Sequence, residues 1–265
     1  MSQHDAPDVR TYAHHNDEEA MPLTAHLEEL RKRLQHSIIA ILVFFVPVYS
    51  FSKLVLGFLQ RPVLDAFPPG AVPFALLRLP EGFFTELKAS FLVAILLASP
   101  FLLFQVWRFV APGLYPQEKR FALPMMVCSS LFFFTGAAFA YYVVFPFGFA
   151  FFLSYAEGAT AASLSLSWYL TFCVQLLIAF GLVFQLPIVV LFLSRLGLVT
   201  AQKMRSVRKM AILVIFVVSA ILTPPDVITQ LFMAGPMILL YELSVIIAQI
   251  FGKKRVETEE ESYDV

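Results

Sequence analysis

The sequence predicts an all-α integral membrane protein with six transmembrane helices, and three observations support this fold class. Of the 265 residues, 59% are hydrophobic and only 14% are charged, which leaves more apolar surface than a soluble domain can bury. The apolar residues form long uncharged runs, which are typical of membrane-spanning helices. Lys and Arg are distributed unevenly between the connecting loops, as in polytopic membrane proteins.

The orientation is predicted from these basic residues. Six spans place both termini on one side of the membrane, and that side holds fifteen of the nineteen Lys and Arg residues. The other side holds only Lys53, Arg61, Arg78 and Lys88. Because short loops rich in Lys and Arg stay in the cytoplasm, we expect both termini to be cytoplasmic.

The chain is organised around the segment Met21–Phe51, which begins as an amphipathic helix and continues into the first span. The pairs Glu28/Lys32 and Glu29/Arg33 place an acid four residues before a base, which supports an exposed helix. Four leucines share one face of this helix because they recur at steps of four, three and four: Leu23, Leu27, Leu30 and Leu34.

The remaining spans are delimited by uncharged runs and by proline. The proline-rich connection Ser52–Leu87 is too apolar for a flexible linker, so we expect it to pack on the outer membrane surface with short helices. The later spans are predicted at Lys88–Val110 with a kink at Pro100, Ala122–Phe145 ended by Pro146, Trp168–Leu193 interrupted at Gly181 and Pro187, Met210–Leu222, and Val227–Ile250.

The fifth and sixth spans are expected to be short. Met210–Leu222 has thirteen residues, or ~20 Å of helix, against the ~30 Å of a hydrocarbon core. Gly235 and Pro236 are predicted to break the sixth span near its start. Two short neighbouring helices would thin the bilayer locally.

One membrane domain, residues 21–252, is expected between two polar tails. Residues 1–20 carry acids and histidines without a spacing that fixes metal geometry, so we expect a disordered cytoplasmic tail there. Residues 253–265 form a charged cytoplasmic tail. Cys128 and Cys173 lie in apolar runs, which predicts thiols that behave as small hydrophobes and no disulfide framework.

Polar side chains at membrane depth are candidates for a functional site, because each costs free energy unless it is satisfied or used. Gln185 precedes Pro187 by two residues and has two interpretations: a hydrogen bond to backbone freed by the proline, or a role facing a ligand. Glu242 lies inside the sixth span and could serve either a structural or a functional hydrogen bond. Gln105 is a similar neutral case, and Asp226 lies at the outer end of the fifth span.

Two acids on the basic cytoplasmic side form a second candidate site. Glu29 and Glu118 could each make an ordinary ion pair, Glu29 with Arg33 and Glu118 with Lys119 or Arg120. They could instead receive a cationic ligand, for which arginine provides bidentate pairing. No HExxH, GxSxG, P-loop or GxGxxG motif occurs, so neither an enzyme nor a cofactor or metal site is predicted.

Four runs carry longer motifs: HLEELRKRL (His26–Leu34), QVWRFVAPGLYPQEKRF (Gln105–Phe121), AFAYYVVFPFGFAF (Ala138–Phe151) and LTPPDVITQ (Leu222–Gln230). Together they resemble the TatC family, the polytopic subunit of the twin-arginine protein translocase, in order over about Pro22–Lys253. The resemblance implies a cupped six-span fold in the cytoplasmic (inner) membrane. It also implies recognition of twin-arginine signal peptides on precursors exported folded, single-span TatA- and TatB-type partners, and a homo-oligomer within a complex.

The resemblance also assigns residues. It implies a signal-peptide site formed by Glu29, Arg31, Phe109 and Glu118. Asp226 matches the outer aspartate of the family's TPPD run. Further positions are expected to shape the loops around the spans: Pro112, Leu114 and Tyr115 in the first cytoplasmic loop, and Pro62 and Phe84 in the first outer loop.

Gln185 departs from the family pattern, since many members carry glutamate there. An amide can hydrogen-bond to a polar partner helix but cannot hold a charge or carry a proton. Two other classes of function stay open. A solute or ion-coupled transporter would use Gln185, Glu242 and Asp226 along a pathway, and a structural scaffold would need none of these polar residues.

Overall fold

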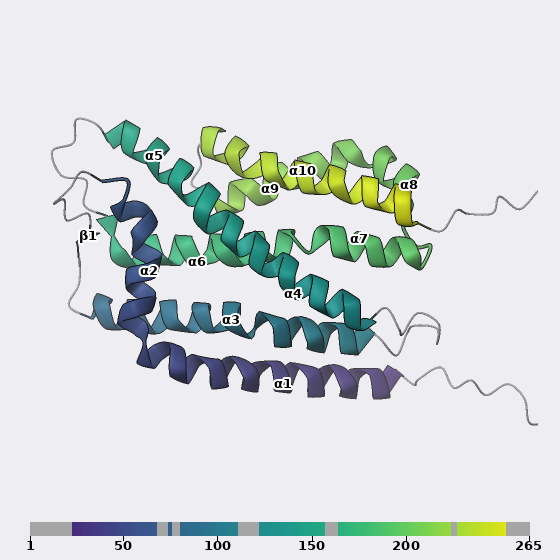
Figure 1. Ribbon diagram of the computed structural model, residues 1–265, viewed down its shortest axis with the longest axis horizontal. Helices are drawn as coiled ribbons and strands as arrows, with labels where there is room; N and C mark the ends of the chain where they lie inside the picture. Colours follow the sequence, from purple (N-terminus) through teal and green to yellow (C-terminus); the bar gives the residue numbers. More distant parts are fainter. Residues whose placement is uncertain are drawn as a thin grey trace, which may run out of the picture.

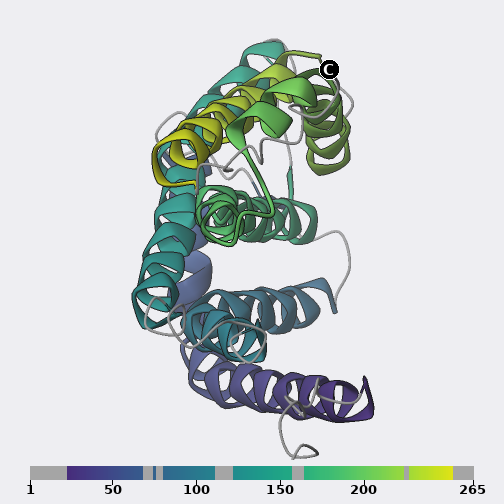
Figure 2. The same cartoon turned by 90° about the vertical axis from the view of Figure 1, so that its right-hand side faces the viewer.

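The structure is a computed structural model that describes residues 23–67, 74–75, 80–110, 122–156, 164–223 and 227–252. Within these ranges almost every residue is helical, which confirms the all-α fold class. Long helices lie side by side in Figure 1, and the end-on view in Figure 2 shows that they follow a curved outline rather than a closed bundle. The start of α1 and the end of α10 lie at the same end of the molecule, here called the terminal end.

Helix α1 (Leu23–Ser50) joins the charged segment and the first apolar run into one helix, as the sequence predicts. It passes through Pro47 and packs chiefly against α3 (Glu81–Val110). Most of its side chains face away from the rest of the protein, so α1 is the least buried of the long helices. Helix α3 likewise contains a proline, Pro100, and continues through it.

The first long connection contains a short helix, as the sequence predicts. It lies at the end of the molecule opposite the terminal end, here called the far end. Helix α2 (Ser52–Leu64) contains Pro62, which is buried. Because a proline has no N–H, the carbonyl of Phe58 four residues earlier has no donor within the helix. The hydroxyl of Tyr141 donates to that carbonyl at 2.7 Å, and the hydroxyl of Tyr169 donates to the neighbouring Leu59 carbonyl at 2.7 Å. Two other helices therefore hold α2 in place (Figure 1).

The third span does not end at Pro146, so that prediction was wrong. Helix α4 (Ala122–Phe139) passes through a π-helix, η4 (Ala140–Val144), into α5 (Phe145–Ala156). The N–H of Phe145 donates to the carbonyl of Ala140, five residues back. This wider turn directly before Pro146 lets the helix axis continue through the proline.

The fourth span is interrupted where the sequence predicts at Pro187, but not at Gly181. Helix α6 (Leu166–Val183) ends just before Phe184 and Gln185, and α7 (Leu186–Arg195) begins with Pro187 in its first turn. Gly181 lies inside α6, where a Cβ would come within 2.7 Å of the Phe133 ring. This glycine therefore allows α4 and α6 to pack closely.

In the last part of the chain the fifth span is short, as the sequence predicts, but the sixth is not. Helix α8 (Ala201–Ser206) leads into α9 (Arg208–Leu222), which has 15 residues. Helix α10 (Val227–Phe251) has 25 residues and runs unbroken through Gly235 and Pro236, so its expected shortening was wrong. A transmembrane helix can keep its axis through a proline when neighbouring groups satisfy the freed carbonyl.

Five helical segments in the described part of the chain are long and apolar enough to cross a membrane: Leu27–Ser50, Glu81–Val110, Leu123–Phe151, Leu166–Arg195 and Val227–Phe251. Helix α9 is too short to join them. The strands β1 (Phe74–Ala75) and β2 (Leu164–Ser165) pair in parallel at the far end and connect the two loops there. The main buried core lies in the far half, around Tyr169, Phe145 and Phe180.

Candidate functional site

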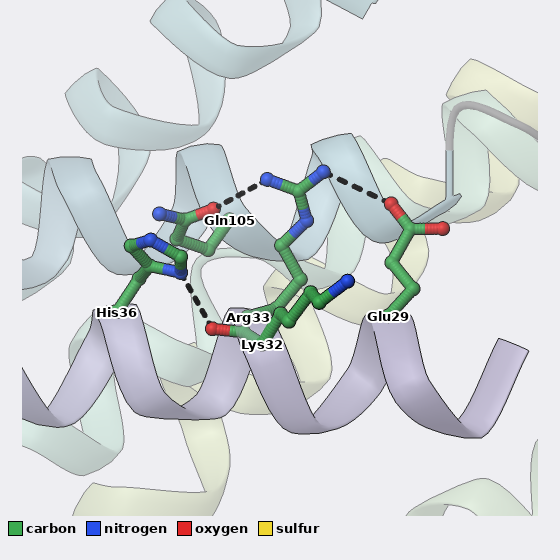
Figure 3. A network of polar contacts seen from close by, with 5 residues as sticks. All are labelled: Glu29, Lys32, Arg33, His36 and Gln105. Atoms are coloured by element: carbon green, nitrogen blue, oxygen red, sulfur yellow. Dashed lines mark hydrogen bonds and ion pairs between the residues drawn. The ribbon is translucent and has the colours of Figure 1, made fainter. Parts of the chain in front are cut away.

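The candidate site lies at the terminal end, where α1 begins and α3 ends. Arg33 on α1 bridges the two helices (Figure 3). Its Nη2 donates to Oε1 of Glu29 at 2.9 Å, and its Nη1 donates to Oε1 of Gln105 on α3 at 3.2 Å. We call these three residues the Arg33 cluster. It joins a carboxylate, a guanidinium and an amide from two neighbouring helices.

Burial distinguishes this cluster from an ordinary surface ion pair. The side chains of Glu29 and Arg33 are each 21% exposed, and Gln105 is 5% exposed. The adjacent pair Glu28–Lys32 has the same four-residue spacing and the same 2.9 Å distance, but its side chains are 66% and 63% exposed. Of these two neighbouring pairs, therefore, only the one in the Arg33 cluster is partly removed from water and connected to a second helix.

Glu29 pairs with Arg33, as the ion-pair interpretation predicts. This contact uses only one of the two carboxylate oxygens. One oxygen of Glu29 receives Arg33, and the second points away from it (Figure 3). Among the described residues this second oxygen has no hydrogen-bond partner. A carboxylate offers about four acceptor positions, so Glu29 can still accept a cationic ligand.

The other residues expected at this site are only partly covered. Arg31 is exposed on the first turns of α1. Phe109 is partly buried on α3, four residues after Gln105 and therefore on the same side of the helix. Glu118 and the loop residues Pro112, Leu114 and Tyr115 lie outside the described residues. The pairing of Glu29 with Glu118 across one site stays a prediction.

Gln185 makes a contact that neither sequence interpretation anticipated. Its Nε2 donates to the backbone carbonyl of Ser129 on α4 at 2.8 Å. The hydroxyl of the same Ser129 accepts the indole N–H of Trp107 on α3 at 2.9 Å. We call this group the Ser129 node; its three residues are all buried. It connects α3, α4 and the break between α6 and α7.

The sequence reasoning missed Ser129 and Trp107. A signal was present, because a buried tryptophan needs an acceptor for its indole N–H, and the apolar run after Trp107 contains few side chains that can provide one. The ring of Trp107 also packs edge-on against Phe192 of α7, with the ring centroids 4.9 Å apart. The node is therefore packed as well as hydrogen-bonded.

Glu242 has a structural partner as well. Its Oε2 accepts Nη2 of Arg208, at the start of α9, at 2.8 Å. Both side chains are partly exposed, and Gln249 further along α10 pairs with Arg205 of α8 in the same region. Glu242 thus lies near the terminal end and links α10 to the short α9. Asp226 lies outside the described residues.

Comparison with known proteins gives a consistent family. The sequence model described as Sec-independent protein translocase protein (TatC) matches residues 25–236. A protein of that name from Desulforapulum autotrophicum is 46% identical over 93% of this chain and 91% of its own length. The protein of that name from Escherichia coli is 38% identical over 90% of this chain and 92% of its own length.

Solved structures agree with these matches. A crystal structure described as the twin arginine translocase receptor TatC superposes with a TM-score of 0.77 at 40% identity, covering 84% of this chain and 97% of that one. A second, solved in DDM, superposes with a TM-score of 0.79 at 39% identity, covering 85% of this chain and all of that one. The chain therefore belongs to the TatC family of Sec-independent protein translocase proteins.

Proposed function

We propose that this chain is the signal-peptide receptor and core subunit of a translocase that exports folded proteins with twin-arginine signals across the cytoplasmic membrane. The observation that carries the proposal is the likeness, over most of both chains, to solved structures of a twin arginine translocase receptor. The Arg33 cluster adds a chemical reason, since it leaves one carboxylate oxygen of Glu29 without a partner among the described residues, at the terminal end of the molecule.

The proposed topology has six spans with both termini in the cytoplasm. The five long helices and the shorter α9 together supply an even number of crossings, which is consistent with the start of α1 and the end of α10 lying together (Figure 1). The excess of Lys and Arg on the connections at that end supports a cytoplasmic location. Residues 21–252 then form the membrane domain, and residues 1–20 and 253–265 form cytoplasmic tails.

Signal-peptide binding is proposed to occur at the terminal end. Glu29 and Glu118 would each accept a guanidinium, because charge-assisted hydrogen bonds between guanidinium and carboxylate groups are strong and directional. Arg31 and Phe109 would border the site. The residues Pro112, Leu114 and Tyr115 would shape the loop that carries Glu118, and the buried Pro62 would hold the far end in place.

The proposed partners are single-span TatA- and TatB-type subunits and further copies of this chain. Polar side chains in or beside the spans would contact them: Gln185, Glu242 and Asp226. Gln185 already donates to the Ser129 carbonyl, so it would offer a partner mainly its amide oxygen. The partly exposed Glu242 would have to share its carboxylate with Arg208.

Site-specific photocrosslinking in native membranes tests the receptor role. A photoreactive residue at position 117 would be exposed to a precursor that carries either a twin-Arg or a twin-Lys signal. We expect crosslinks to the twin-Arg signal alone, lost in Glu118→Ala and retained in Glu28→Ala, which changes only the exposed pair with Lys32. Equal crosslinking of both signals, or of neither, would contradict the proposal.

The solute transporter is not favoured. The polar side chains that it would use lie on separate contacts, with Gln185 bonded to α4 and Glu242 bonded to the start of α9. A transporter would bind its solute with no peptide present and would tolerate replacement of Glu118. Both properties can be measured on the same membranes.

A further inference from the structure

We propose that Arg33 determines the preference of this site for arginine over lysine, by cancelling the charge of Glu29 while leaving one of its oxygens as an acceptor. The inference rests on the proposed function, because it concerns the same site. Arg33 acts through Glu29 and is therefore a specificity-determining residue that needs no contact with the ligand. Three features of the Arg33 cluster support this role.

The first feature is the way in which Arg33 engages Glu29. The contact uses Nη2 and Oε1 only, and the other terminal nitrogen of Arg33 is held by Gln105. Because Gln105 is buried and belongs to α3, it fixes the guanidinium against a second helix. Arg33 in turn fixes the carboxylate, so Oε2 of Glu29 is already oriented when a ligand arrives.

The second feature is the charge balance. A lysine ammonium is a compact, strongly hydrated charge. It therefore needs a strong electrostatic attraction at the site to offset the free energy of removing its water. Beside Arg33, Glu29 presents a pair of zero net charge, which weakens that attraction. A guanidinium is less strongly hydrated and gives its hydrogen bonds from a planar fork. An oriented oxygen with little net field around it therefore favours arginine.

The third feature is a local loss of folding stability at Arg33, which a purely structural role of this residue does not explain. The Nε of Arg33 is buried and has no hydrogen-bond partner among the described residues. A buried donor without a partner destabilises a fold. The neighbouring Glu28–Lys32 pair shows that this helix can hold the same four-residue ion pair in water, without such a cost. The inward position of Arg33 is consistent with a requirement of the site.

Binding of two matched signal peptides to the full chain in membranes tests the proposal. Each peptide carries a photoreactive residue beside either an Arg-Arg or a Lys-Lys pair, and crosslinking is measured per folded receptor. Arg33→Gln should reduce the Arg-Arg over Lys-Lys ratio by roughly three- to fivefold, the size expected for a partly exposed charge contact. Most of this change should come from stronger crosslinking of the Lys-Lys peptide.

Two further variants separate this role from a structural one. Lys32→Gln removes the same charge from the adjacent exposed pair and should leave the ratio unchanged. Arg33→Lys keeps the charge beside Glu29 and should retain most of the ratio, even if it lowers the amount of folded receptor. The proposal is overturned if Arg33→Gln weakens both peptides equally, or if Lys32→Gln changes the ratio as much.

Failure of the proposed function would give a different result. If the unchanged receptor crosslinks the two peptides equally or not at all, the receptor role fails and this inference fails with it. If the unchanged receptor discriminates but Arg33→Gln discriminates equally well, only the role of Arg33 is overturned.

Discussion

The Arg33 cluster and the Ser129 node lie on opposite sides of the same stretch of α3. Gln105 faces α1 and Trp107, two residues later, faces α4 and α7. The cluster is charged, is partly open to water, and keeps a carboxylate oxygen unused among the described residues. The node is neutral and buried, and the indole N–H of Trp107 and the side-chain amide of Gln185 both donate within the chain. The two polar groups near membrane depth thus differ in charge and in exposure to water, and of the two only the cluster keeps an ionised oxygen without a partner among the described residues.

The largest effect should come from breaking the node at Trp107. Trp107→Ala removes a buried ring and the donor to Ser129, so it should lower the free energy of unfolding by about 3–5 kcal/mol. Thermal unfolding of the detergent-purified protein measures this change. Trp168→Ala is the matched control, because that ring is exposed on α6, and it should have little effect. Similar losses from both variants would show that the node does not hold the helices together.

Replacing Glu29 in the Arg33 cluster should weaken the binding of twin-Arg signal peptides. Glu29→Ala removes a charge-assisted contact, and such contacts contribute about 1.5–3 kcal/mol, so twin-Arg signal binding should fall at least tenfold with a small change in thermal stability. Glu28→Ala removes the exposed acid next to it and should leave binding unchanged. Titration of a fluorescent signal peptide into the receptor in nanodiscs checks both values. Equal losses from the two variants would mean that general negative charge, and not the site, binds the peptide.

The smallest effect should come from Gln185. Gln185→Leu removes one hydrogen bond between helices, and such bonds contribute about 0.6 kcal/mol inside membranes. The melting temperature in detergent should fall slightly, far less than for Trp107→Ala. Gln175→Leu, which changes an exposed amide on α6, is the control. A loss as large as that of Trp107→Ala would show that Gln185, and not the tryptophan, dominates the node.

Three of the prolines in the helical segments, Pro146, Pro187 and Pro236, show what the sequence could predict. Proline in a helix interior predicts a break, and at Pro187 the chain does break. At Pro146 a preceding π-helical turn lets the helix continue through the proline, and at Pro236 the helix continues without such a turn. Nothing in a single sequence indicates which response a membrane helix will take, because the outcome depends on neighbouring helices that satisfy the freed carbonyls.

The candidate site also has contacts that the sequence could predict and contacts that it could not. The contact between Glu29 and Arg33 could be predicted, since a four-residue spacing on a helix brings side chains together. Arg33 and Gln105 are 72 positions apart in the chain, and Gln185 and Ser129 are 56 apart. Pairs so distant depend on how whole helices pack, which local spacing does not encode. Charge patterns predict the membrane orientation and the candidate acids, whereas the distant partners Gln105 and Ser129 could be found only from the fold.

The i,i+4 spacing of Glu29 and Arg33 also has a consequence for the order of synthesis. N-terminal segments of a chain emerge first from the ribosome, so α1 is complete before α3 exists. Its two charges can already neutralise each other on that single helix, and Gln105 joins them when α3 arrives. The Ser129 node must wait until residue 185 has been made. During biogenesis, the proposed binding group is therefore assembled first, and the contacts that hold α3, α4 and α7 together are completed afterwards.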